Sequence, residues 1–187
     1  MGSNAVTLPY WQVNVPPSQR EIECPAYLQD LKPKDVAIIS TPDSEYHILT
    51  WSEVQAIIAR NALDAFQRMP SDLRRYLAYN YFLKQKYGSV MEFVLRERLG
   101  WEQPIVAEGR PFERESDMKI LWNDWPYGID AKIVHLVVWT KFELEDDPAT
   151  DDLKVKARAE VEAFVQRTFG NVVGKENVSY YKDRDLK

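Results

Sequence analysis

The run IVHLVVWT at residues 133–140 restricts the fold more than any other segment of this sequence. It is the most strand-like stretch of the chain, and it is apolar on both faces under the two-residue alternation of a strand. Such a strand needs cover on both sides, so we predict that it lies centrally in a sheet packed against helices. It closely follows the sequence NDWPYG at residues 123–128, whose Asn, Asp, Pro and Gly favour a turn.

Helical signals fill the middle of the chain. Two capping boxes, a Ser or Thr followed by Glu three residues later, stand at residues 50–53 and 89–92. We predict helices from Thr50 through about Phe66, from Pro70 to Tyr87 with Gly88 in a left-handed position, and from Val90 to just before Gly100. The apolar residues expected inward on the first two are Val54, Ile57, Ile58, Phe66, Leu73, Leu77 and Tyr81, with Lys84 on the same side.

The remaining segments complete an α+β pattern. Strands are predicted at residues 36–40, 119–122, 133–140, 172–173 and 178–181, and a helix at residues 153–169, ended by Gly170. We therefore expect a single α+β domain over residues 36–187, with a helical block packed on a small, mainly antiparallel sheet. Residues 1–35 are rich in proline and are predicted to form an irregular arm, anchored by Tyr10, Trp11 and Tyr27.

Composition narrows the class of protein. The chain has 187 residues, a net charge of −5 and one cysteine, Cys24. No apolar run approaches the roughly 18–20 residues that span a bilayer, and no secretory signal is visible, so we expect a cytoplasmic protein without a membrane partner. The two histidines and the cysteine lie far apart, which argues against a metal site, and the sequence lacks the common phosphate-binding glycine loops. We expect no cofactor.

The NDWPYG turn is the first candidate site. Asn123 and Asp124 would present an amide and a carboxylate at the end of a strand, with Trp125 and Tyr127 as flat walls. The alternative is a turn that is purely structural. His135, in the following strand, is either a hydrogen-bonded core residue or a general base that lines the site.

Two charged regions are the other candidates. Residues 53–100 carry eight Lys or Arg against five Asp or Glu, among several tyrosines. They form either a solvated face with local ion pairs or a surface for an RNA backbone. The acidic loop at residues 143–152 holds six carboxylates. It is either a solvated connection or a site for a guanidinium or ammonium group.

The sequence LWNDWPYGIDAKIVHLVVWTK at residues 121–141, the helix ARAEVEAFVQRTFG and the helical block at residues 46–95 resemble the fungal N-acetylglucosamine-induced protein 1 family. The resemblance covers residues 45–182. It implies an arginine-containing cyclodipeptide synthase, whose substrates are arginyl-tRNA and a second charged tRNA. Members of the family continue past the last strand to a His-x-His pattern, whereas this sequence stops at Asp185-Leu186-Lys187.

The resemblance gives the candidate residues expected roles. Peptide formation from aminoacyl esters needs two acyl groups held close together, a base and donors to the oxyanion. We expect the base to be Asp124 or His135 and the donors to be Asn123 and Tyr127. Substrate contacts are assigned to Trp125, Trp139, Asp130 and Lys141, and the tRNA surface to Arg74, Arg75, Lys84 and Lys86.

Two other classes of function stay open. One is a small-molecule or nucleotide-binding protein linked to amino-sugar metabolism, with a compact pocket at the NDWPYG turn. The other is a non-catalytic regulatory protein, in which substitution of Asp124 or His135 would change stability alone.

Overall fold

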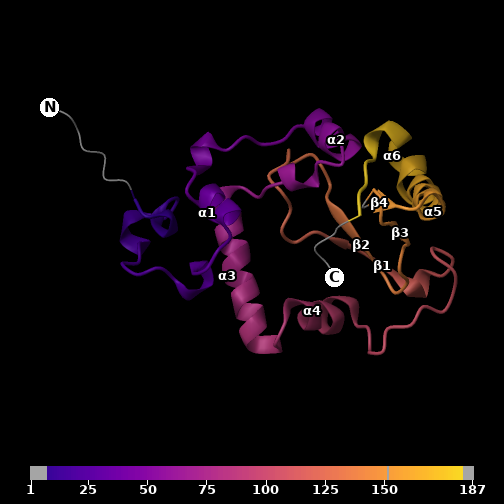
Figure 1. Ribbon diagram of the computed structural model, residues 1–187, viewed down its shortest axis with the longest axis horizontal. Coiled ribbons are helices and arrows are strands. Elements are labelled where there is room, and N and C mark those ends of the chain that lie inside the picture. Colours follow the sequence, from indigo (N-terminus) through magenta and orange to yellow (C-terminus); the bar gives the residue numbers. More distant parts are fainter. Residues whose placement is uncertain (1–7, 151, 183–187) are drawn as a thin grey trace. The chain divides into compact units, whose positions relative to one another are not determined.

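The computed structural model describes residues 8–150 and 152–182 (Figure 1). Asp151 of the acidic loop and the last five residues, which include Asp185-Leu186-Lys187, lie outside this part. Its helices and strands are α1 (Pro33–Ile39), α2 (Trp51–Ala59), α3 (Pro70–Tyr87), α4 (Val90–Phe93), β1 (Met118–Trp122), β2 (Leu136–Thr140), β3 (Asp146–Asp147), β4 (Asp152–Leu153), α5 (Val155–Val165) and α6 (Asn171–Val173). The α+β class is confirmed.

The contacts within the chain divide it into two compact units. Unit 1 contains the described residues of Met1–Glu53, Asp64–Gly100 and Asp124–Ile133. Unit 2 contains those of Val54–Leu63, Trp101–Asn123 and Val134–Lys187. The chain thus passes from one unit to the other within the NDWPYG turn, between Asn123 and Asp124. The expected arrangement of an N-terminal arm and one domain stays a prediction.

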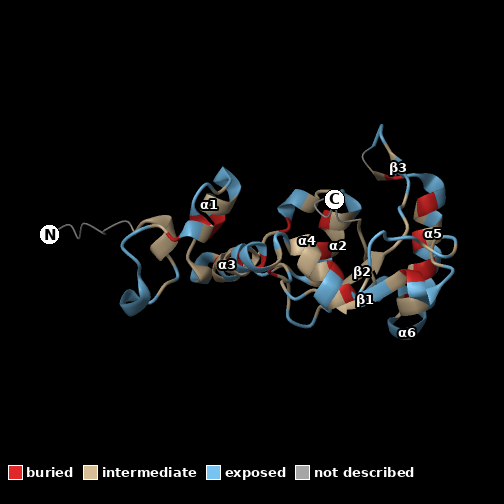
Figure 2. Ribbon diagram, turned by 90° about the horizontal axis from the view of Figure 1, so that it is seen from below, coloured by how far each residue is buried: buried red, intermediate tan, exposed pale blue. Residues whose placement is uncertain are grey.

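The core of unit 1 corrects the first predicted strand. Residues 36–40 belong to α1 and its C-cap instead of a strand, because Pro33 occupies the first helical position and Asp35 lies in the first turn. Ile38 and Ile39 are buried on this helix with Leu28 and Leu73 (Figure 2). Burial of the β-branched side chains in this cluster outweighs their preference for strands. The predicted anchors Tyr10, Trp11 and Tyr27 pack against the same cluster.

The capping boxes are confirmed at α2 and α4. Thr50 N donates to Glu53 Oε2 over 2.8 Å, and Glu53 N donates to Thr50 Oγ1 over 3.4 Å. At α4, Ser89 Oγ accepts from Glu92 N over 3.0 Å. However, α2 already ends at Ala59. Phe66 is buried, but it lies beyond the end of this helix and beyond Asn61, a residue with a φ of 52°.

Helix α3 has the predicted bounds but a different buried face. It begins at Pro70 and ends at Gly88, which has a φ of 83°. Leu73 and Leu83 are buried on this helix, whereas Tyr81 is 42% exposed and Lys84 is exposed. The predicted stripe is therefore correct near the start of the helix and wrong near its end, where Leu83 is buried and Tyr81 and Lys84 are exposed.

Unit 2 contains the β1–β2 hairpin and a second hydrophobic core. Met118 lies opposite Thr140 and Trp122 opposite Leu136 in an antiparallel pair. Among the described residues β2 pairs with β1 alone, so the prediction of a central strand is wrong. His135 lies just before β2, and its carbonyl accepts from Asn123 N over 2.9 Å.

The C-terminal part of unit 2 departs furthest from prediction. Leu153, Ala157 and Val161 form its core, and Phe164 is also buried, as expected for the predicted helix. The helix does not end at Gly170, because a π turn at Gln166–Gly170 leads into α6. Residues 172–173 are thus helical, and residues 178–181 are extended without a strand partner in the described part of the chain. The two predicted strands there are wrong.

Candidate functional site

The aromatic residues of the NDWPYG turn pack within unit 1. The ring of Trp125 lies 5.9 Å from that of Tyr76 and 5.5 Å from that of Tyr79. Tyr127 stacks on Phe66 at 5.2 Å. Rings at these distances stabilise one another beyond the area they bury. The predicted flat walls therefore contact rings of the chain itself.

Arg68 holds this aromatic cluster together. Its guanidinium lies 3.9 Å from the ring centre of Tyr76 and 5.1 Å from that of Tyr127. Its Nε donates to the carbonyl of Trp125 over 3.0 Å. Sequence reasoning counted Arg68 only as one of many basic residues, because its partners are far away in the sequence.

The carboxylates of Asp124, in the turn, and of Asp130, just after it, both have partners within unit 1. Asp124 forms an ion pair with Arg98, and Asp130 accepts a hydrogen bond from the backbone N–H of Lys132 over 2.9 Å. Asp130 N also donates to the carbonyl of Leu49 over 2.9 Å. The roles assigned to Asp124 and Asp130 stay predictions.

Gly128 closes the turn against the segment that precedes α2. Its N–H donates to the carbonyl of Gln67 and its carbonyl accepts from Leu49 N, both over 2.9 Å. A Cβ at this position would lie 2.4 Å from both Cε1 and the hydroxyl oxygen of Tyr46. Only glycine fits this close approach of backbone to ring.

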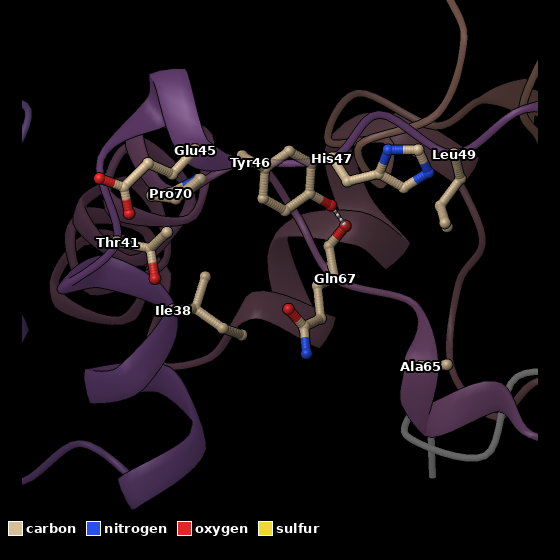
Figure 3. A pocket seen from close by; sticks show the side chains of 9 residues that line it. All are labelled: Ile38, Thr41, Glu45, Tyr46, His47, Leu49, Ala65, Gln67 and Pro70. Carbon is tan, nitrogen blue, oxygen red and sulfur yellow. Dashed lines mark hydrogen bonds between the residues drawn. The ribbon is translucent and has the colours of Figure 1, made fainter.

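A cavity of about 370 Å³ lies beside this contact (Figure 3). It is lined by Ile38, Thr41, Glu45, Tyr46, His47, Leu49, Ala65, Gln67 and Pro70. The Tyr46 hydroxyl donates to the carbonyl of Gln67 over 2.8 Å. Burial, with a smaller contribution from the Asp72 charge, raises the pKa of Tyr46, so its hydroxyl stays a neutral donor.

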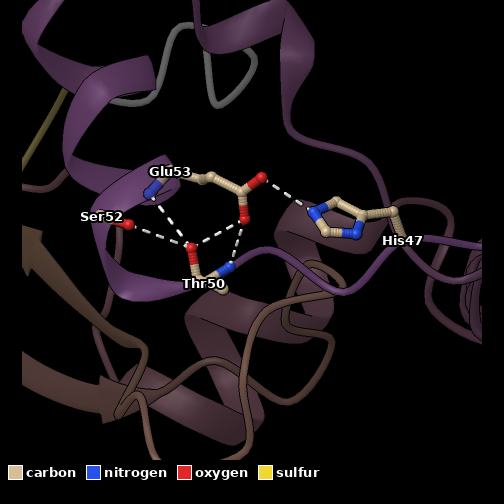
Figure 4. Close-up of polar contacts among 4 residues, drawn as sticks. All are labelled: His47, Thr50, Ser52 and Glu53. Atoms are coloured by element: carbon tan, nitrogen blue, oxygen red, sulfur yellow. Dashed lines mark hydrogen bonds and ion pairs between the residues drawn. The ribbon is translucent and has the colours of Figure 1, made fainter.

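His47, one of the polar residues that line the cavity, forms a pair with Glu53 (Figure 4). His47 Nε2 lies 2.8 Å from Glu53 Oε1. The backbone N–H of Thr50, then its hydroxyl, then His47 lower the pKa of Glu53 from 4.5 to about 2. His47 was not singled out from the sequence, although the glutamate of the capping box that follows it is its partner.

The pKa of Glu53 leads to a pH-dependent prediction. Because its pKa is lower in the folded state, the hydrogen bonds of its carboxylate contribute stability above pH 4.5, and this contribution is lost as the pH falls toward 2. The urea midpoint of Glu53→Gln should lie below that of the wild type at pH 6, and the gap should narrow steadily from pH 4.5 toward pH 2. A gap that stays constant over this range would contradict the assignment.

The other predicted site residues lie in unit 2. Asn123 Nδ2 lies 3.5 Å from each ring nitrogen of His135, and the Tyr181 hydroxyl lies 3.5 Å from His135 Nε2. Lys141 Nζ lies 5.6 Å from the Trp101 ring centre. Asn123 and His135 are therefore brought together, at the long limit of hydrogen bonding. Their catalytic roles, and the role of Trp139 on β2, stay predictions.

The predicted tRNA-binding residues fall into two groups on α3. Arg74 donates to the carbonyl of Trp11, and Arg75 forms an ion pair with Asp72. Lys84 and Lys86 lie in the exposed last turn, and Lys86 Nζ is 5.0 Å from the Tyr87 ring centre. The lysines are thus more available to a partner than the two arginines.

The acidic loop in unit 2 binds cations of its own chain. Ion pairs join Glu145 to Lys154, Asp146 to Lys182 and Asp152 to Arg158. These pairs favour the structural interpretation of the loop. No group of three or more potential metal ligands occurs among residues 8–150 and 152–182. Within the same residues, no helix is long and apolar enough to cross a membrane.

Comparison with known proteins identifies the family of this chain. The model of a family described as "Protein of unknown function (DUF3605)" matches residues 50–186, most of the sequence. The chain belongs to the DUF3605 family. The matched region contains Glu53, α3 and the NDWPYG turn, whereas His47 and Tyr46 lie just before it.

Relatives and a solved structure agree with this assignment. N-acetylglucosamine-induced protein 1 of Candida albicans is 24% identical over 139 residues, which cover 64% of this chain and 55% of the relative. An uncharacterised protein of Saccharomyces cerevisiae is 26% identical over 133 residues, covering 69% and 66%. A structure titled "Crystal Structure of HTC1" matches with a TM-score of 0.50 and 26% identity, covering 63% of this chain and 65% of that one.

The expected resemblance to N-acetylglucosamine-induced protein 1 is confirmed. The match spans between about half and two thirds of the length of these relatives.

Proposed function

We propose that this chain binds aminoacyl-tRNA and catalyses aminoacyl transfer to an amine, forming an arginine-containing cyclic dipeptide. The observation that carries this proposal is the exposed C-terminal end of α3. Two lysines lie there beside two exposed rings, Tyr81 at 42% and Phe82 at 53% exposure. The resemblance of the sequence to cyclodipeptide synthases supplies the reaction class.

The end of α3 has the chemistry of an RNA-binding surface. Lysines bind phosphates, and exposed aromatic rings stack on unpaired bases. Lys86 Nζ lies 5.8 Å from the Phe82 ring centre and 5.0 Å from that of Tyr87, so cation and rings share one patch. These rings add little to the core of unit 1, and a partner that covers them would explain their presence.

The length of α3 connects this patch to the cavity within unit 1. The helix has 18 residues, and Pro70 at its start lines the cavity. Lys84 follows Pro70 by 14 residues, or about 21 Å at the rise of an α-helix. A tRNA end held at the last turns would extend along the helix by about this distance to place its aminoacyl group at the cavity.

This reaction requires the protein to position its two substrates more than to activate a bond. The aminoacyl ester is already activated, so the protein has to hold two acyl groups and accept a proton from the attacking ammonium. No covalent intermediate on the protein is required. An aminoacyl-tRNA substrate also requires a compartment that holds charged tRNA, for which we propose the cytoplasm.

The direct test is product formation. The protein is incubated with arginyl-tRNA and each second charged tRNA in turn, and cyclic dipeptides are sought by mass spectrometry. We expect a product that contains arginine. Absence of product from every mixture, with a longer member of the DUF3605 family active in parallel, would overturn the proposal for this chain.

Charge reversal at the end of α3 should weaken tRNA binding. For Lys84→Glu/Lys86→Glu we expect at least about tenfold weaker binding at low salt, and a slope of log affinity against log salt that is smaller by about 1.4–1.8, as for two lost phosphate contacts. Filter binding at several salt concentrations measures both quantities. Lys132→Glu/Lys156→Glu changes the net charge equally at exposed positions and should have little effect. Equal losses in both variants would contradict the proposed surface.

A second candidate is a small-molecule binding protein, in line with the name of the Candida albicans relative. The observation that favours it is the cavity beside Gly128, close to the pocket expected at the NDWPYG turn. This function requires saturable binding of an amino sugar such as N-acetylglucosamine that is indifferent to Lys84→Glu/Lys86→Glu. Titration followed by NMR distinguishes it from the first proposal.

A further inference from the structure

Arg68 in unit 1 is fixed in position by groups that carry no charge. Its guanidinium carbon lies 3.9 Å from the ring centre of Tyr76 and 5.1 Å from that of Tyr127, and its Nε donates to the carbonyl of Trp125 over 3.0 Å. Its Nη1 and Nη2 form no hydrogen bond or ion pair with the residues that the structure describes. Within the same residues no side-chain nitrogen or oxygen is both buried and without a hydrogen bond, so these two groups are accessible.

The charge of Arg68 is therefore open to an anion. The carboxylates of Asp72 and Asp124, which could have served as its partners, bind Arg75 and Arg98 instead. A guanidinium is planar, and its two terminal groups match two oxygens of a phosphate in a pair of parallel hydrogen bonds. The stacking on Tyr76 and the bond to the carbonyl of Trp125 hold this plane in place before a ligand arrives.

A continuous row of aromatic rings leads from this guanidinium along α3. The ring centre of Trp125 lies 5.9 Å from that of Tyr76 and 5.5 Å from that of Tyr79, and the ring of Tyr79 lies 6.5 Å from that of Phe82. All four rings are at least partly exposed. The row ends at Lys86, whose Nζ lies 5.8 Å from the ring centre of Phe82. One face of unit 1 thus has a row of rings with a cation at each end.

We infer that this row binds the single-stranded 3′ end of a tRNA, with a phosphate on Arg68 and a base stacked on Phe82. The inference rests on the proposed function and gives that function a path for its RNA. Single strands are bound by cations along the backbone and by aromatic faces on which bases stack, and the row supplies both. Lys86 follows Tyr76 by 10 residues, or about 15 Å at the rise of an α-helix. About four stacked nucleotides, at roughly 3.4 Å each, span this distance.

Arg68 lies at the end of the row that adjoins the cavity. In the sequence it stands between Gln67 and Pro70, both of which line the cavity. Lys84 and Lys86 lie at the other end, in the last turn of α3. A strand that contacts both ends is therefore directed along the helix toward the cavity.

Binding is measured by fluorescence anisotropy with the whole chain and a labelled, uncharged RNA of sequence ACCA at several salt concentrations. Arg68→Gln should weaken binding by about tenfold or more, because it removes two hydrogen bonds to a charged group. The slope of log affinity against log salt should fall by about 0.7, as for one lost phosphate contact of a single strand. Arg60→Gln removes the same charge at an exposed position of unit 2 and should bind as the wild type does. Equal binding by Arg68→Gln and the wild type overturns the phosphate site.

Two further variants separate a loss of binding from a loss of structure. Arg68→Lys retains the charge but not the planar fork, so its affinity should fall while its salt slope stays that of the wild type. Phe82→Leu changes a ring that is 53% exposed, so its urea midpoint should stay unchanged. Its affinity for the RNA should fall by about tenfold through the loss of stacking. Unchanged affinity of Phe82→Leu would show that the row does not carry the strand and would overturn the inference.

A competing probe and a comparison with turnover complete the test. Hexaglutamate that displaces the RNA and binds more tightly would assign the row to a protein partner and overturn the inference. If the wild type binds ACCA through Arg68 but forms no cyclic dipeptide from charged tRNAs, the proposed reaction fails and the RNA site stands. If product forms and Arg68→Gln keeps the KM of the wild type for charged tRNA, the proposed function stands and the strand lies elsewhere.

Discussion

Gly128→Ala should destabilise unit 1 by about 2–4 kcal/mol, from overpacking and the loss of a hydrogen bond. The added Cβ would lie 2.4 Å from two atoms of the Tyr46 ring system. The ring could yield only toward the cavity, and this movement would break the hydrogen bond of its hydroxyl to the carbonyl of Gln67. Either the ring leaves its place or the turn moves away from Leu49. Urea unfolding of the variant and the wild type measures the difference.

Two companion variants isolate the cause. Gly109→Ala brings a Cβ to 3.0 Å from the flexible Arg114 side chain, which can move, so we expect a much smaller loss of stability. Tyr46→Ala removes the obstructing ring, and the double variant Gly128→Ala/Tyr46→Ala should lose less than the sum of the single variants. Additive losses would show that the strain arises elsewhere in the turn.

Local signals in the sequence predicted local structure well. Both capping boxes form, because a serine or threonine and a glutamate three residues later satisfy backbone groups at the start of a helix without help from distant residues. Pro70 begins α3 and Gly88 ends it for the same local reasons. The antiparallel pairing of β1 with β2 also follows from alternation and the turn formers between them.

Features that depend on distant partners were not predictable. The apolar run at residues 36–40 reads as a strand, but burial of Ile38 and Ile39 against Leu28 and Leu73 makes it a helix. The run at residues 133–140 reads as a central strand, yet β2 has one partner in the described chain. Apolar pattern shows that a segment is covered but does not show what covers it.

The sequence indicated the position of the candidate site better than it indicated the contacts of the residues in it. The NDWPYG turn does adjoin a cavity, but through Gly128 and not through its tryptophan. Pairing of Asp124 with Arg98 and stacking of Tyr127 on Phe66 need the fold to be known. His47 and Glu53 could have been connected from the sequence, since a histidine three residues before a capping box lies within reach of its glutamate.

Asp117→Ala should destabilise unit 2 by about 3–5 kcal/mol. Asp117 is completely buried, and its carboxylate accepts hydrogen bonds from the backbone N–H groups of Glu108 and Gly109 at 2.9–3.0 Å. Alanine would remove the acceptor of two part-buried N–H groups, whose hydrogen bonds to a charged group contribute about 1.5–3 kcal/mol each, and would open a small void. The loop at residues 108–109 would lose its attachment to the start of β1. Chemical denaturation, with hydrogen exchange at Glu108 and Gly109, measures the loss.

Substitutions that keep part of the geometry show which property of Asp117 matters. Asp117→Asn retains one oxygen, which can accept from both Glu108 N and Gly109 N, but it places an amide NH2 group, itself a donor, at the other position. We therefore expect a loss between that of Asp117→Ala and zero. Glu115→Ala removes an exposed carboxylate from the same turn and should stay within about 0.5 kcal/mol of the wild type. If Asp117→Asn were as unstable as Asp117→Ala, the charge of the carboxylate, and not the satisfaction of the two N–H groups, would hold the loop.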